Sequence, residues 1–323
     1  MTNENSLSQL PLVVFSDITD LDPAPAEKIL SENGYATMRL DLAQTKNVPA
    51  EAQRASGMIV GYADIDDRIL SQFPQLKVAA TCSAGTDMVD KAAARQHSVS
   101  VVNLPGVATE EVAEHALSLI LASERGLVDF SAVVSSGKWT EDATWLPRRI
   151  SSLTLGLIGF GKIGQRLAHL AAPLFGEIIA YDPYFTGKSS TEIVELEELQ
   201  HRSDIISLHL PLTEDTKGIV SEQFLSHLRT GAVLVNVSRG ELVDDNAVRA
   251  ALTNNSLRFY AADVLVGDPP APSDPMRTEP KTLLTPHIAF LSEQSKRSYE
   301  EEPARNVISV LAGTRKTTRE QVW

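Results

Sequence analysis

Cysteine is nearly absent from this sequence, since Cys82 is the only one among 323 residues. A single cysteine excludes an intrachain disulfide and any metal site built from several thiolates. Basic residues are also scarce, with 29 Lys and Arg against 42 Asp and Glu, and the formal net charge is −13. A surface of this sign repels phosphate backbones and anionic lipid head groups, so we expect neither nucleic acid nor a membrane surface as a partner.

Long apolar stretches and targeting signals are missing too. No run approaches the roughly 18 apolar residues that a membrane-spanning helix needs. The first ten residues, MTNENSLSQL, carry no positive charge and no apolar stretch of signal-peptide length. We therefore expect a cytoplasmic protein. The composition, with 43% hydrophobic and 22% charged residues, is typical of globular proteins, and the length suffices for about two domains.

Short apolar runs alternate with helical patterns in the first third of the chain. The expected strands are 11–17, 35–41, 57–62, 76–81 and 98–103. Between the first two, Pro23 and Pro25 open a helix that stops at Gly34. Helix-like composition also marks 50–56, 66–73 and 87–97. Strands that alternate with helices in this way form a parallel sheet covered on both faces.

A long helix is expected over residues 109–126, with Thr109 as its N-cap and Gly126 as its stop. Its apolar positions recur every three or four residues, which predicts one buried face. The stretch 135–152 that follows contains turn formers, two tryptophans and a basic pair. We interpret it as a loop or short helix that packs on its own chain or contacts a second subunit.

A second alternating series begins at Leu153. Its expected strands are 153–159, 177–182, 204–210, 232–237, 258–264 and 282–287, and its expected helices are 162–175, 192–202, 221–229 and 244–254. Six strands in this rhythm match a complete doubly wound nucleotide-binding sheet. The helical tail 292–313, with a kink expected at Pro303, cannot extend a completed sheet and should return to the first domain. The predicted domains are therefore 1–105 with 292–323, and 106–291.

A G-x-G-x-x-G motif is formed by Gly159, Gly161 and Gly164, between an apolar strand and an apolar helix. The first glycine permits a tight turn, the second lets the backbone approach a pyrophosphate, and the third lets helix and strand pack closely. The helix N-terminus then presents free N–H groups to the anion. This context favours a dinucleotide site over a tight turn without a ligand.

Asp182 ends the next expected strand, 18 residues after Gly164. An acidic residue near this spacing binds the adenosine ribose hydroxyls in dinucleotide-binding domains. A carboxylate there accepts from two hydroxyls and repels a 2′-phosphate, which favours NAD over NADP. The alternative interpretation of Asp182-Pro183 is a turn that merely ends the strand.

Charged side chains follow the last three strands of the second series. Arg239 comes after one strand end, Asp263 and Asp268 after the next, and His287 after the last. In a parallel sheet these ends share the carboxyl edge, where ligands bind. Each residue alone is ordinary, but a cation, two carboxylates and an imidazole beside a nicotinamide predict a catalytic site.

These motifs resemble, over nearly the whole chain, the D-isomer-specific 2-hydroxyacid dehydrogenases. The resemblance is carried by CSAGTDMVD (82–90), VATEEVAEHAL (107–117), LGLIGFGKIG (155–164), YDPY (181–184), SLHLPLTEDTKG (207–218), VNVSRGELVD (235–244), AADV (261–264) and TPHIAFLSEQ (285–294). The last motif is most similar to the branch of the C-terminal-binding-protein corepressors and their bacterial relatives. The resemblance implies an α/β protein with two doubly wound parallel-sheet domains, a flavodoxin-like substrate domain and a Rossmann NAD-binding domain, and it implies a homodimer.

The resemblance also implies roles for individual residues. His287 matches the proton donor and acceptor, Arg239 matches the arginine that binds the 2-oxo acid, and Asp268 stands where the family usually has a glutamate that orients the histidine. Cofactor contacts are implied for Lys162, Ile163, Asp182, Leu210, Val237, Ser238 and Asp263. The turn Ser83-Ala84-Gly85 matches the one whose backbone N–H groups hold the substrate carboxylate.

The sequence thus predicts an NAD-dependent oxidoreductase that transfers hydride between nicotinamide and C2 of a small 2-oxo acid or D-2-hydroxy acid. Asp268 is one methylene shorter than glutamate, so either its backbone moves closer to His287 or the pair is looser. One alternative is an NAD(H)-sensing, corepressor-like binding protein with little catalysis. Another is a different dinucleotide enzyme, such as an amino-acid dehydrogenase or an oxidiser of phosphite or formate. Phe290 stands where the corepressor-like branch often has tryptophan, which leaves the substrate open.

Overall fold

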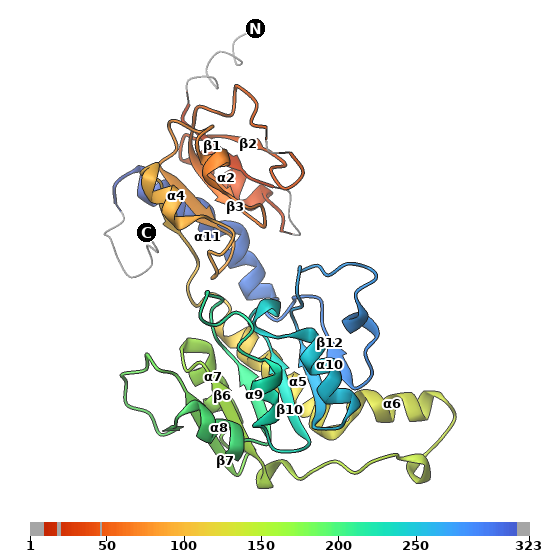
Figure 1. Cartoon of the computed structure of the whole chain (residues 1–323). Helices are drawn as coiled ribbons and strands as arrows, with labels where there is room; N and C mark the ends of the chain where they lie inside the picture. The colour runs from red at the N-terminus through yellow and green to blue at the C-terminus, as the bar shows by residue number, and fades with distance from the viewer. Residues whose placement is uncertain (1–9, 18–20, 46, 315–323) are drawn as a thin grey trace. The chain divides into compact units, whose positions relative to one another are not determined.

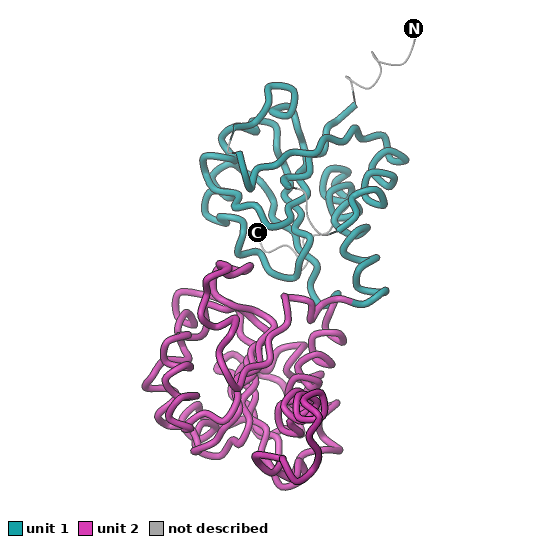
Figure 2. Tube along the Cα trace, turned by 90° about the vertical axis from the view of Figure 1, so that its right-hand side faces the viewer, with its two compact units in different colours: residues 1–107, 292–323 teal, residues 108–291 magenta. Residues whose placement is uncertain are grey.

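The computed structural model describes residues 10–17, 21–45 and 47–314 (Figure 1). The chain forms two compact units, one of residues 1–107 with 292–323 and one of residues 108–291 (Figure 2). We call them unit 1 and unit 2. The predicted α/β class with two parallel sheets is confirmed. In the described part of the chain, no helix combines the length and the apolar character needed to cross a membrane.

Unit 1 is built on a five-stranded parallel sheet in the order β2-β1-β3-β4-β5, the order of flavodoxin-like folds. Its strands are β1 (Leu12–Phe15), β2 (Ala36–Arg39), β3 (Ala55–Val60), β4 (Val78–Thr81) and β5 (Ser100–Val102). Successive residues of β1 point to opposite faces. Leu12 and Val14 therefore join one apolar core, and Val13 and Phe15 join the other.

Helices cover both faces of this sheet. The core that contains Leu12 is closed by α3 (Asp67–Leu70) and α4 (Lys91–Gln96), and the core that contains Val13 is closed by α2 (Ala24–Glu32) and α11 (Glu293–Leu311). The C-terminal helix α11 thus packs in unit 1 beside α2, β3 and β4. It runs through Pro303 within its bounds.

The helix expected over residues 50–56 is wrong. Ala52 N–H donates to Pro49, and Ala55 N–H donates to Ala52, so consecutive turns replace a helix. Ala55 then begins β3 and pairs with Leu12 of β1. A stretch this short makes too few helical hydrogen bonds to offset the cost of nucleation. Its last two residues, 55 and 56, belong to β3 instead.

Unit 2 is built on a seven-stranded parallel sheet in the order β12-β11-β10-β9-β6-β7-β8. Its strands are β6 (Thr154–Ile158), β7 (Glu177–Tyr181), β8 (Glu192–Ile193), β9 (Ile205–Leu208), β10 (Ala232–Asn236), β11 (Leu257–Ala262) and β12 (Thr282–Leu284). The strands β7 and β8 extend the sheet on one side of the first strand, β6. The chain then crosses back, and β9 to β12 extend the sheet on the other side, as in the doubly wound nucleotide-binding fold. The carboxyl ends of β6 and β9 therefore flank the point where the strand order reverses.

The helices of unit 2 are α5 (Thr109–Arg125), α6 (Leu127–Ser135), α7 (Lys162–Ala171), α8 (Leu196–Arg202), α9 (Glu222–Ser226) and α10 (Asp245–Thr253). Short 3₁₀ turns are η1 (Thr140–Asp142), η2 (Ile150–Ser152), η3 (Gly240–Leu242) and η4 (Pro275–Thr278). The predicted face of α5 is buried, with Ala113, Ala116, Leu119 and Ile120 in one core together with α7. Ala108, rather than Thr109, is the N-cap of α5.

Two elements of unit 2 differ from expectation. Residues 192 and 193 form β8 beside β7, so the helix expected from 192 begins only at Leu196. Helix α6 was not expected: Gly126 ends α5 in a left-handed conformation at φ 61° and at once starts α6. None of the residues of α6 is buried, so its apolar residues carry no core-facing pattern that could have revealed it.

Candidate functional site

The turn between β6 and α7 has the geometry that a dinucleotide-binding motif requires. Gly159 has φ +94°, and a Cβ there would lie 2.4 Å from the carbonyl oxygen of His209. A Cβ at Gly164 would lie 2.4 Å from the carbonyl oxygen of Gly159. At Gly161, the N-cap of α7, a Cβ would meet no atom of the other described residues within 4 Å, its chain neighbours aside. There is thus no room for a side chain at Gly159 and Gly164, where the turn packs on its own backbone, but there is space beside Gly161, where a pyrophosphate would approach. These residues therefore fit the cofactor.

This contrast predicts opposite outcomes for two single-methyl substitutions. We expect Gly164→Ala to lower the free energy of unfolding by about 1–3 kcal/mol, because the methyl collides with fixed backbone. Gly161→Ala should leave stability unchanged or slightly raised, since φ is −73° and the space is open. Its effect should instead be weaker NADH binding. Urea unfolding and NADH fluorescence titration of both variants test this, and a destabilised Gly161→Ala protein would contradict it.

Asp182 lies directly after β7, beside the glycine turn. Its carboxylate accepts from the backbone N–H of Phe160 at 2.9 Å and from the N–H of Tyr184 at 2.9 Å. These bonds hold the side chain next to Gly159 and Gly161. A carboxylate has about four acceptor positions, so two remain for ribose hydroxyls.

The other predicted cofactor contacts of this region lie on the same edge of the sheet. Lys162 and Ile163 form the first turn of α7. Leu210 follows β9 and is half-buried, and Val237 follows β10 and is buried. Ser238 donates its hydroxyl proton to the Leu208 carbonyl at 2.8 Å, which joins the ends of β9 and β10. The structure thus brings these residues to one edge, and their contacts with a cofactor stay predictions.

Arg239 sits at the carboxyl end of β10 and is the N-cap of η3. Its backbone is held by Asn236, whose Nδ2 donates to the Arg239 carbonyl at 2.8 Å. One guanidinium nitrogen, Nη1, donates to the Ser238 carbonyl at 2.8 Å. The side chain is half-buried, so the guanidinium is oriented by the protein before any substrate binds.

His287 and Asp268 form the pair that the sequence predicts. The Asp268 carboxylate is hydrogen-bonded to Nδ1 of His287, although Asp is shorter than the glutamate usual in the family. The two side chains are 33% and 34% exposed. Nδ1 is bonded to Asp268, so Nε2 is the ring nitrogen that a substrate would meet. Of the two possibilities for Asp268, the structure supports a backbone close enough to suit the shorter side chain.

The backbone of His287 is in the left-handed region, at φ +52°. A residue other than glycine in this region costs on the order of 1–3 kcal/mol and persists only when its surroundings hold it there. The backbone N–H of His287 donates to the Asp263 carbonyl at 2.8 Å. Such strain is common at active sites.

Asp263 makes contacts that its position in the sequence does not predict. Its carboxylate is 1% exposed and accepts from the Thr285 hydroxyl at 2.6 Å, from Ile288 N–H at 2.9 Å and from Ala289 N–H at 2.8 Å. The structure therefore commits this carboxylate to the segment that carries His287. As a cofactor contact, Asp263 stays a prediction.

His209 is a further histidine near this edge of the sheet, directly after the end of β9. Its Nε2 lies 2.9 Å from the Ser207 hydroxyl, while its Nδ1 is buried and has no hydrogen-bond partner in the described part of the chain. Burial lowers the pKa of His209 to about 4. The ring is therefore neutral at physiological pH and cannot serve as the proton donor that His287 can be.

The turn Ser83-Ala84-Gly85 follows β4 in unit 1, and its carbonyl groups are all occupied. Thr81 Oγ1 donates to the Ser83 carbonyl at 3.0 Å, Asn103 Nδ2 to the Ala84 carbonyl at 2.6 Å, and Ser83 Oγ to the Gly85 carbonyl at 2.8 Å. No described residue accepts a hydrogen bond from the N–H groups of these three residues. A turn with free N–H groups and occupied carbonyls suits an anion such as a carboxylate.

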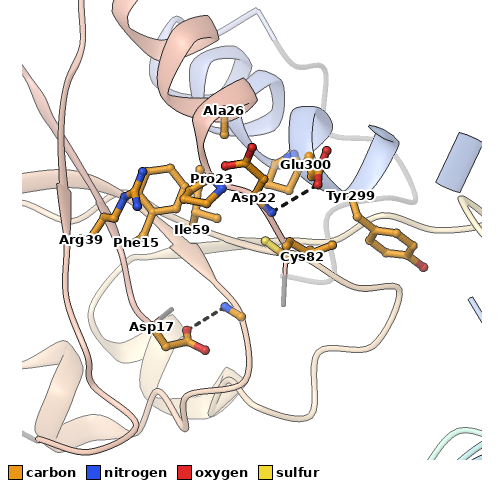
Figure 3. Close-up of a pocket in the computed structure, with 13 residues that line it drawn as sticks. Phe15, Asp17, Asp22, Pro23, Ala26, Arg39, Ile59, Cys82, Tyr299 and Glu300 are labelled. Atoms are coloured by element: carbon orange, nitrogen blue, oxygen red, sulfur yellow. Dashed lines mark hydrogen bonds between the residues drawn. The ribbon is translucent and has the colours of Figure 1, made fainter. Parts of the chain in front are cut away.

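A small cavity lies at the carboxyl edge of the unit 1 sheet, between β1, β3 and the first turns of α11 (Figure 3). Its volume is about 40 Å³, which is room for a few water molecules. The Asp17 carboxylate beside it is already bonded to the N–H groups of Gly61 at 3.0 Å and Tyr62 at 2.7 Å. The described residues contain no cluster of side chains suited to a metal ion.

Comparison with known proteins places these observations in a family. The sequence model of the "D-isomer specific 2-hydroxyacid dehydrogenase, NAD binding domain" matches residues 117–289. Glycerate dehydrogenase of Methylorubrum extorquens is 33% identical over 251 residues, which are 76% of this chain and 79% of that protein.

Solved structures agree with this match. D-lactate dehydrogenase of Aquifex aeolicus, in complex with NAD and lactic acid, has a TM-score of 0.84 at 25% identity and covers 94% of this chain and 96% of its own. The NADPH-dependent glyoxylate/hydroxypyruvate reductase of Sinorhizobium meliloti, in complex with NADP and malonate, has a TM-score of 0.84 at 26% identity and covers 96% of both chains. None of these three is a corepressor, so the branch expected from the TPHIAFLSEQ motif stays a prediction.

Proposed function

Given that this chain belongs to the D-isomer-specific 2-hydroxyacid dehydrogenase family and is an NAD-dependent oxidoreductase, we propose that it reduces a small 2-oxo acid to a D-2-hydroxy acid. The observation that carries the proposal is the Asp268–His287 pair on the same sheet edge as Arg239. The relatives described above are named for glycerate, lactate, glyoxylate and hydroxypyruvate, all acids of two or three carbons.

The roles of the residues follow from their positions and chemistry. His287, held by Asp268, gives a proton from Nε2 to the carbonyl oxygen at C2, and takes it back in the reverse direction. Arg239 offers two parallel N–H donors and a fixed positive charge to the carboxylate and to the oxygen that becomes negative. The turn Ser83-Ala84-Gly85 binds the substrate carboxylate through its backbone N–H groups. When bound, the dinucleotide supplies the hydride that C2 receives.

The test is a panel of 2-oxo acids with NADH, containing glyoxylate, hydroxypyruvate, pyruvate, and longer and aromatic acids. We expect turnover of the two- and three-carbon acids, with kcat in the usual range of about 1–10³ s⁻¹. NADH binding without reduction of any acid would overturn the proposal and favour the NAD(H)-sensing alternative. Oxidation of formate or phosphite would favour the other alternative, and reductive amination of the same acids would indicate an amino-acid dehydrogenase.

Asp182 predicts the choice of cofactor. We expect NADH to bind at least about tenfold more tightly than NADPH, because hydrogen bonds to a charged group are worth about 1.5–3 kcal/mol and a 2′-phosphate would be repelled. Asp182→Asn should remove most of this preference, while Glu195→Gln, an exposed site with the same change of charge, should not. Fluorescence titration with both reduced cofactors measures this. Equal affinities in the wild type would remove Asp182 from the cofactor site.

We also propose a cytoplasmic homodimer formed through unit 2. Helix α6 and the following loop expose large apolar side chains, namely Leu127, Val128, Val134, Trp139 and Leu146. Trp145 instead packs on its own unit, with Nε1 donating to Asp129 at 3.0 Å and Arg258 lying 4.4 Å above its ring. An exposed apolar set of this kind marks an interaction surface. Sedimentation equilibrium tests the proposal, and a monomer at micromolar concentration would contradict it.

A further inference from the structure

A chain of hydrogen bonds leads from helix α5 to the segment that carries His287. Nε2 of His115 lies 2.9 Å from the Thr285 hydroxyl, and that hydroxyl lies 2.6 Å from Oδ1 of Asp263. A carboxylate only accepts, so the one hydroxyl proton of Thr285 points to Asp263. The hydroxyl oxygen must then accept from His115, which assigns the Nε2–H tautomer to that ring.

Asp263 connects these hydrogen bonds to the segment 285–289. Its buried carboxylate accepts from the Thr285 hydroxyl on one side of His287 and from the N–H groups of Ile288 and Ala289 on the other. We call the set of His115, Thr285 and Asp263 the clamp. His115 lies 3.6 Å from the carboxylate, which is too long for a direct hydrogen bond. His115 therefore acts within the clamp through the hydroxyl of Thr285.

We propose that His115 is a positioning residue for proton transfer: with Thr285 and Asp263, it holds the 285–289 segment so that the His287 ring stays aimed at the reacting oxygen. The left-handed backbone of His287, at φ +52°, needs such support on both sides. This inference rests on the proposed role of His287. It gives a function to a histidine on α5, away from the loops that carry the predicted site.

Activity of matched variants is the first test. We expect His115→Leu to lower kcat for glyoxylate reduction by about tenfold, because small displacements of an acid–base group have large effects on rate. The Kd of NADH should stay within about twofold of wild type, because lost positioning lowers kcat rather than binding. His115→Gln places an N–H donor at a similar reach and should restore kcat to within about threefold of wild type. Ser118→Ala, on an exposed position of the same helix, is the control and should change nothing.

Hydrogen exchange of the cofactor-free protein is the second test, and it does not depend on the substrate. In His115→Leu, we expect the peptide that contains Ile288 and Ala289 to exchange about tenfold faster than in wild type, with other peptides unchanged. Thr285→Val should reproduce this effect, and Thr285→Ser should not. The double variant His115→Leu/Thr285→Val should be no worse than the worse single variant, because both changes break one chain.

The outcomes separate this inference from the proposed function. Unchanged exchange at Ile288 and Ala289 in both His115→Leu and Thr285→Val overturns the clamp. Faster exchange with an unchanged kcat overturns the positioning role. A uniform rise in exchange with a loss of Tm in His115→Leu, and no effect of Thr285→Val, assigns His115 to general stability and also overturns it. A wild type that reduces no 2-oxo acid refutes the proposed function, while the exchange data still decide whether the clamp exists.

Discussion

Arg239→Lys is expected to lower kcat/KM for 2-oxo acid reduction by about 10²–10³-fold, the usual effect of losing an oriented donor to a developing oxyanion. Lysine keeps the positive charge but loses the planar pair of donors that matches a carboxylate and a carbonyl together. In this protein it also loses the bond from Nη1 to the Ser238 carbonyl that orients the guanidinium. The Kd of NADH should stay within about threefold of wild type, because the change affects substrate rather than cofactor.

The control for Arg239 is Arg305→Lys, the same substitution at a surface arginine that pairs with Glu301 and Glu302 on α11. Steady-state kinetics of both variants with glyoxylate and NADH decide the matter. If Arg239→Lys keeps its activity within about threefold of wild type, the substrate is held by other residues. If both variants lose activity equally, the loss is not specific to the substrate site.

Asp268→Asn is expected to lower kcat/KM for reduction by about 10²-fold at neutral pH, within the range that general acid catalysis contributes. The amide can still orient His287 but no longer compensates the positive charge of the protonated ring. Oxidation of the D-2-hydroxy acid, which needs the unprotonated ring, should lose less.

Asp268→Glu tests whether the backbone around residue 268 is placed for the shorter aspartate side chain. The Asp268 carboxylate already reaches Nδ1 of His287, so an added methylene should displace the ring. Misplacement by about 1 Å can cost about 10²-fold in rate. We therefore expect this substitution to lower activity rather than raise it, although glutamate is the usual residue of the family at this position.

The measurement is kcat/KM at neutral pH, in the reductive and the oxidative direction, for wild type and both Asp268 variants. Asp67→Asn is the control, because Asp67 forms a second His–Asp pair, 2.8 Å from His97 and on the surface of unit 1. A value of kcat/KM for Asp268→Asn that equals the wild type in both directions would show that Asp268 does not partner His287. Higher activity in Asp268→Glu would show that the native pair is loose.

The sequence by itself determined the class of fold and the edge of the sheet on which the site lies. Buried parallel strands are continuous apolar runs, because both of their faces are covered. All eleven expected strands are present, from 12–15 to 282–284. The glycine motif, Asp182 and the charged residues after β10, β11 and β12 could be placed at the carboxyl edge from strand order alone.

Only the tertiary structure decided the elements whose stability comes from distant partners. Residues 50–54 form turns because Ala55 pairs with β1 and so cannot continue a helix. The two residues of β8 are a strand only because they pair with β7. Helix α6 has no buried side, so no periodicity in its sequence could reveal it.

The same limit applied to the site. Whether the Asp268 carboxylate reaches His287 depended on the backbone of the loop between them, which local sequence does not specify. The clamp of His115, Thr285 and Asp263 joins residues up to 170 positions apart. A hydrogen bond needs its donor and acceptor within about 3 Å, and only the folding of α5 against the sheet brings these residues that close.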